Sequence, residues 1–115
     1  MTALSLAFDH VDSVLVASLT GRLDSTTAKE LETALLERIA AGETRLVLDF
    51  ARLDYISSAG LRVVLLAGKR TSAAGGRTAL SGLGTSIRAV FEISGFIAIF
   101  PVSDTVAGGV AAVAG

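Results

Sequence analysis

Two adjacent serines, Ser57 and Ser58, are the best placed residues for chemistry, because they lie between a predicted strand and a predicted helix. Residues 46–50 form a short apolar run typical of a buried strand, and residues 61–67 are apolar again. A hydroxyl at the mouth of a helix accepts a hydrogen bond from a free backbone N–H. Either serine can be this cap, and the other hydroxyl then lies near the positive end of the helix dipole, where a phosphate is tolerated. The alternative is that both serines only cap the helix.

Other catalytic patterns are incomplete. Ser58-Ala59-Gly60 lacks the leading glycine of a nucleophile elbow, since Ile56 stands in its place. A serine hydrolase also needs a base, and the one histidine, His10, is expected to be a solvated turn residue. Gly68-Lys69 lacks the other residues of a phosphate-binding loop. The sequence therefore predicts a protein that is not an enzyme, with no cofactor.

Composition limits the class of protein further. The 115 residues are 51% hydrophobic and 18% charged, which suits one domain over residues 1–115. A net charge of −1 gives no basic face for nucleic acid, and the lack of cysteine with a single histidine argues against zinc. No signal peptide and no apolar run of membrane-spanning length is present, so we expect a cytoplasmic protein.

The first half of the chain predicts a hairpin and a crossover. A half-exposed strand at 4–8, a turn at 9–13 and a strand at 14–19 form an antiparallel pair. A polar loop at 20–25 follows, in which Asp24 or Ser25 caps a helix at 26–41. A helix between this strand and the strand at 45–50 implies parallel pairing. The expected inner face of the helix is Ala28, Leu31, Leu35 and Ile39.

The helix after Ser58 has a polar and an apolar side. In a helical projection its core side holds Leu61, Val64, Leu65 and Gly68. The opposite side holds Arg62, Lys69 and Arg70, with Val63 beside Arg70. Leu66 falls between Arg62 and Lys69, where it is either a partner contact or an ordinary exposed leucine.

The second half predicts a strand at 77–81, a helix capped by Thr85 or Ser86 and ended by Gly95, and a last strand at 97–102. Ser103 or Asp104 caps a final helix to about residue 113. Its Gly108-Gly109 pair weakens it, so we expect fraying within 108–115. The fold class is therefore α/β, with a mixed, mostly parallel sheet of about five strands, an N-terminal antiparallel hairpin and about four helices.

Several segments together resemble a known family. They are Gly21-Arg22-Leu23-Asp24, Leu46-Val47-Leu48-Asp49, Tyr55-Ile56-Ser57-Ser58-Ala59-Gly60-Leu61, Gly82-Leu83 and Phe91-Glu92-Ile93-Ser94-Gly95-Phe96. This set is similar to a STAS domain of the bacterial anti-sigma factor antagonist kind, over nearly the whole chain.

The resemblance implies a function. Such an antagonist binds an anti-sigma factor that is also a serine kinase of the ATPase type, frees a sigma factor, and is released when its serine is phosphorylated; a serine phosphatase resets it. By position Ser58 is the acceptor, Ser57 replaces the family's aspartate, and Asp24 matches a loop aspartate that contacts the kinase. The predicted partner surface is Asp24, Ser57, Ser58, Ala59, Gly60, Leu61 and Arg62, to which the helical projection adds Leu66. Two alternatives are a STAS scaffold subunit of a lipid-transport or stress-signalling complex, without a phospho-switch, and a nucleotide-binding domain.

Overall fold

One mixed sheet organises the chain. In the computed structural model, which describes residues 3–114, its strand order is β1-β2-β3-β4-β5. The hairpin of β1 (Leu4–Val11) and β2 (Val14–Leu23) is antiparallel. The strands β3 (Arg45–Ile56), β4 (Arg77–Ser81) and β5 (Val102–Ser103) continue the sheet in parallel. The predicted class of an α/β fold with an N-terminal hairpin is confirmed.

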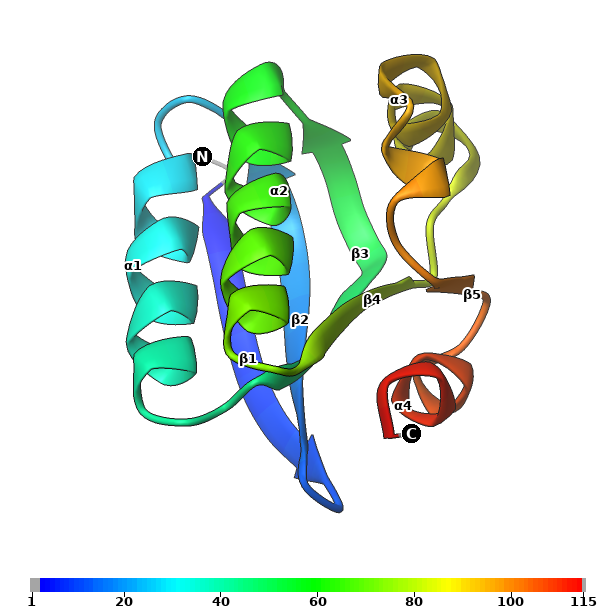
Figure 1. The fold of residues 1–115 in the computed structure, drawn as a ribbon. Coiled ribbons are helices and arrows are strands. Elements are labelled where there is room, and N and C mark those ends of the chain that lie inside the picture. The colour runs from blue at the N-terminus through cyan, green and yellow to red at the C-terminus, as the bar shows by residue number, and fades with distance from the viewer. Residues whose placement is uncertain (1–2, 115) are drawn as a thin grey trace.

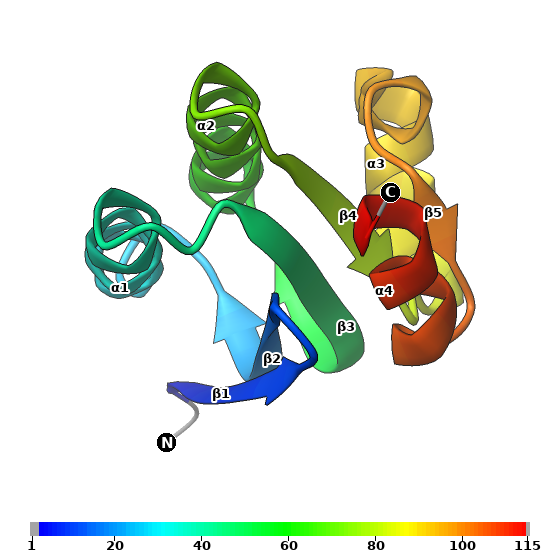
Figure 2. The same ribbon diagram turned by 60° about the horizontal axis from the view of Figure 1, so that its bottom comes forward.

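The helices divide between the two faces of this sheet (Figure 1). Helices α1 (Ala28–Ala40) and α2 (Ser58–Ala73) lie side by side on one face, as Figure 2 also shows, and α3 (Thr85–Ser94) packs into the same core cluster. Helix α4 (Val106–Ala114) covers the other face with a smaller cluster that includes Val47 and Val110. The inner face expected for α1, which is Ala28, Leu31, Leu35 and Ile39, is buried as predicted.

Two strands are longer than the sequence predicts. β2 extends to Leu23 and β3 to Ile56, so residues 20–23 and 51–56 are strand and not loop. The ladder continues through two register shifts and pairs Leu23 with Ile56. Both of these side chains are buried, so apolar anchors at the strand ends hold segments that are otherwise polar. Together these strand ends form the rim of the sheet beside α2.

The predicted last strand at 97–102 is wrong. A 3₁₀ turn, η1 (Phe96–Ala98), occupies the start of this segment, and strand pairing is confined to Val102–Ser103. Phe100 turns inward and is only 7% exposed, close to Gly68 of α2. Pro101 lacks an N–H for the ladder, although its carbonyl accepts from Leu80 N–H at 2.9 Å. Phe100 thus reaches the core from a turn, whereas its neighbour Ile99 is 57% exposed.

Several local predictions also need correction. The N-cap of α1 is Thr27 and that of α3 is Gly84, neither with a side-chain cap bond. In α4 the Thr105 hydroxyl, and not Ser103 or Asp104, accepts from Gly108 N–H at 3.1 Å. Val63, predicted beside the polar side of α2, is only 1% exposed.

The structure near each terminus differs from the conformation predicted there. His10 lies in β1 and not in a turn, and its Nε2 is 2.9 Å from Glu43 Oε1. At the other end α4 is continuous across Gly108 and Gly109 to Ala114, and Gly109 is buried against Val47. The last residue of the segment expected to fray, Gly115, lies outside the described residues.

Candidate functional site

The structure assigns different local roles to the two serines. Ser57 is the N-cap of α2, in an extended conformation, and its side chain accepts from Gly60 N–H at 3.3 Å. Gly60 is required by the close approach of this turn to β2, because a Cβ there would lie 2.7 Å from Leu23 Cγ. The first turn of α2 is therefore fixed firmly against the end of the sheet.

Ser58 is the first residue of α2 and is exposed. Because Ser57 already caps the helix, the hydroxyl of Ser58 is not needed for that purpose. The first turn of α2 contains no acidic residue, so the positive end of its dipole has no nearby carboxylate of its own helix. A phosphoryl group arriving from outside would thus meet an accessible oxygen in a favourable field.

A turn built around Asp24 lies directly beside this helix start. Its Oδ1 accepts from the Thr26 hydroxyl at 2.7 Å and from the Thr26 N–H at 2.9 Å. These hydrogen bonds from Thr26 lower the pKa of the Asp24 carboxyl below its ordinary value. Ser57 N–H donates to the Leu23 carbonyl at 2.9 Å, which ties the turn to α2. Asp24 and Ser58 therefore belong to one end of the molecule.

Arg22 and Tyr55 add a cation and an aromatic ring to the same end. They are paired in register across β2 and β3, and the guanidinium carbon lies 4.2 Å from the ring centroid. Arg22 Nε is also 3.7 Å from Asp24 Oδ2. Tyr55 is 41% exposed, which is unusual for so large an aromatic side chain. Sequence reasoning quoted both residues only as part of the resemblance; the strand pairing that joins them was not predicted.

The remaining residues of the predicted surface separate into three groups. Arg62 is exposed, and its Nη2 is 3.5 Å from Glu32 Oε1 of α1. Ala59 and Leu61 are partly buried against the core, and so they shape the helix start more than the surface. Leu66 is partly buried and lies about 12 Å along the helix axis from Ser58. Leu66 thus lies outside the immediate surroundings of Ser58.

Two kinds of site are not found in the described part of the chain. Residues 3–114 hold no group of three metal-ligating side chains. No helix among them has the length and apolar character needed to cross a membrane. What the helix start offers is an exposed hydroxyl on a rigid surface that carries both charges and an aromatic ring.

Comparisons with known proteins agree on the kind of domain. The sequence profile of the STAS domain family matches residues 5–109. BtrV, a candidate anti-sigma factor antagonist of Bordetella bronchiseptica, is 48% identical over 102 residues, covering 89% of this chain and 88% of that protein. A crystal structure of an anti-sigma factor antagonist from Mycobacterium paratuberculosis superposes with a TM-score of 0.86 at 25% identity, covering 98% and 96% of the two chains.

The structure of a third relative was solved in a phosphorylated form. The Bacillus cell fate determinant SpoIIAA, solved in its phosphorylated form, superposes with a TM-score of 0.75 at 25% identity, over 92% of this chain and 96% of that one. Both structural relatives thus share the fold over almost their full length.

Proposed function

We propose, from the premise that this chain belongs to the STAS domain family, that it is an anti-sigma factor antagonist switched by phosphorylation of Ser58. In its unmodified form it binds an anti-sigma factor that is also a serine kinase of the ATPase type, and so frees a sigma factor. Phosphorylation by that partner ends the complex, and a serine phosphatase restores binding. The names of the relatives support the antagonist role, and the site described above supports the switch.

The observation that carries this proposal is the position of Ser58. It is exposed at the first residue of a helix whose cap is supplied by its neighbour. A kinase can reach such an oxygen without unfolding the chain.

The charge of the phosphate provides the release. Phosphoserine adds roughly −1.5 to −2 charge at neutral pH. At the helix start this charge is compatible with the fold, but within a partner's footprint it must be desolvated, which costs several kcal/mol unless it is paired. About 3 kcal/mol would weaken binding roughly a hundredfold. Release then needs no change of conformation in this chain.

The surface for the partner is centred on Ser58 and the Asp24 turn. Asp24, Arg22 and Tyr55 present a carboxylate, a guanidinium and an exposed ring within one contact network. Arg and aromatic residues are those most often found at the energetic centre of interfaces. We expect Arg22→Ala and Tyr55→Ala to weaken partner binding even in the unphosphorylated protein.

The experiment uses the anti-sigma factor encoded nearest to this chain in its own genome. Incubation of the two proteins with ATP is followed by intact mass, and binding is measured by titration. We expect one phosphoryl group on the wild type, none on Ser58→Ala, tight binding by Ser58→Ala and weak binding by Ser58→Asp.

A matched control is available in α3, because Ser86 is also an exposed serine in the first turn of a helix. Ser86→Asp adds the same charge outside the proposed surface, so its binding should equal that of the wild type. Tight binding by Ser58→Ala and Ser58→Asp alike, with no phosphorylation, would contradict the switch and favour a scaffold role.

A further inference from the structure

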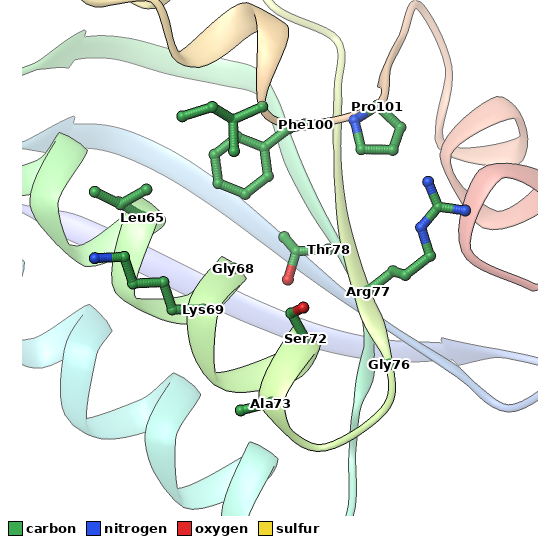
Figure 3. A pocket seen from close by; sticks show the side chains of 11 residues that line it. Leu65, Gly68, Lys69, Ser72, Ala73, Gly76, Arg77, Thr78, Phe100 and Pro101 are labelled. Carbon is green, nitrogen blue, oxygen red and sulfur yellow. The ribbon is translucent and has the colours of Figure 1, made fainter.

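A pocket lies at the other end of α2, far from Ser58 (Figure 3). It occupies about 590 Å³ between the C-terminal half of α2, the start of β4 and the segment 99–101. Gly68 lies about 15 Å along the helix axis from Ser58, so the pocket is separate from the proposed phosphorylation site. Its volume falls within the range of roughly 300–1,000 Å³ that is usual for small-molecule sites.

Glycines and a buried hydroxyl pair build the walls of this pocket. Gly68 admits the Phe100 ring, since a Cβ at Gly68 would lie 2.5 Å from Phe100 Cε1. The hydroxyls of Thr71 and Thr78 are 2.7 Å apart and link α2 to β4, and Thr78 lines the pocket. Both threonines are almost fully buried, so their hydrogen bond fixes the two elements to each other. These contacts fix α2, β4 and Phe100, which surround the pocket, relative to one another.

The lining combines an apolar body with cations. Leu65, Ile99 and Phe100 contribute apolar surface, and Figure 3 shows the side chains of Lys69 and Arg77 on different sides of the Phe100 ring. No lining residue is acidic. Within residues 3–114, neither Lys69 nor Arg77 takes part in an ion pair, so no carboxylate of the described chain neutralises either cation. Two uncompensated cations beside an apolar hollow are complementary to a ligand with one anionic group and a hydrocarbon part.

We propose that this pocket binds a small organic carboxylate with an apolar tail. The tail lies against Phe100 and Leu65, where it removes apolar surface from water. The carboxylate pairs with Arg77, whose planar fork suits two parallel hydrogen bonds, or with Lys69 as a point charge. This inference does not depend on the proposed function of Ser58, because it uses a different end of α2.

The test is a titration of the full chain with decanoate, followed by two-dimensional NMR of the backbone amides. We expect saturable shifts confined to residues 65–78 and 99–101. Lys69→Gln with Arg77→Gln should weaken binding roughly tenfold or more, since hydrogen bonds to charged groups are lost. Ser72→Trp, which fills the pocket from an exposed position on α2, should weaken it as well.

The controls separate the charge from the tail. Arg70→Gln removes an exposed cation of the same helix that does not line the pocket, so its affinity should stay that of the wild type. Decanol and decyltrimethylammonium carry the same tail without the anion, and both should bind more weakly than decanoate. Absence of saturable shifts, equal binding of the cationic amphiphile, or shifts unaffected by the double variant would each overturn the proposal.

Discussion

Replacing Ser58 by aspartate should stabilise the fold at the same time as it weakens partner binding. A negative charge in the first turn of a helix contributes about 0.3–1 kcal/mol. The first turn of α2 has no acidic residue to repel the new carboxylate, and the cap bond that Gly60 N–H donates to Ser57 Oγ is left in place. We therefore expect a gain of about 0.5 kcal/mol in the free energy of unfolding, which is roughly 2 °C in Tm for a chain of this size.

The assay compares urea unfolding of the wild type, Ser58→Asp, Ser58→Asn and Ser86→Asp. Ser58→Asn has a similar shape without the charge, and so it isolates the electrostatic part. Ser86→Asp places a charge at the start of α3, which also has no acidic residue in its first turn. It should give a similar gain in stability and no loss of partner binding. The gain should shrink at 1 M salt, where the Debye length is about 3 Å.

The reasoning fails if Ser58→Asp lowers the free energy of unfolding by about 1 kcal/mol or more. Weak partner binding would then reflect damage to the helix start and not repulsion at an interface. It fails equally if Ser58→Asn gives the same gain as Ser58→Asp, since charge would then be irrelevant. Stability and binding must move in opposite directions for the switch to act by electrostatics alone.

Further predictions concern residues that hold the start of α2 and its neighbouring turn in place, and one close backbone contact elsewhere in the fold. Ser57→Ala should cost about 1 kcal/mol by urea unfolding because the α2 cap is lost, whereas Ser57→Asp should keep it. The Asp24 carboxyl should titrate below its ordinary pKa when followed by NMR. The stabilisation that its charged form provides is present above the ordinary pKa and is lost as pH falls through the lowered pKa. This pH dependence should be absent in Asp24→Asn. Gly76→Ala should cost at least about 2 kcal/mol by the same unfolding assay, because its Cβ would lie 1.8 Å from Thr44 O.

Periodicity predicted the elements whose burial follows a simple repeat. The four inner residues of α1 recur at helical spacing and are all buried. Strand β4 has the predicted bounds, and Gly95 ends α3 with a φ of 82°, which glycine adopts without strain. In α1 one face packs against the core and the other faces water, so the local pattern and the tertiary structure agree. Strand β4 is buried on both faces from Thr78 to Ser81.

Segments shaped by distant contacts were not predictable in this way. The end of β3 is polar, and it stays in the sheet because β2 pairs with it. The segment 97–102 was predicted as a strand, but Phe100 packs against Gly68 of α2 instead. Val63 is buried although the projection put it beside Arg70, because the buried stripe of α2 is rotated away from the predicted one. The stripe consists of Gly60, Val63, Val64, Ala67 and Thr71, whereas Leu61, Leu65 and Gly68 of the predicted core side are only partly buried. In each case the deciding partner is far away in the chain.

The candidate site was predicted in position but not in detail. The serine pair could be placed at a helix start from the sequence, but which serine caps depends on the path of the backbone. Arg22 and Tyr55 are brought together by the extended pairing of β2 and β3, which the sequence did not predict. Leu66 was included on the strength of a helical projection, yet the helix length separates it from Ser58.

The serine at position 57 bears on how the proposed switch would work. By resemblance, this position usually holds an aspartate, which would put a permanent negative charge at the start of α2. Here the cap is neutral, so a phosphate on Ser58 would meet the helix dipole without repulsion from its neighbour. The proposed partner would find no carboxylate at position 57, so the Asp24 turn with Arg22, and Arg62 one turn along α2, would supply the charged contacts around the acceptor. Binding by the unmodified form should therefore depend more on the Asp24 turn, and release should depend on the single charge change at Ser58.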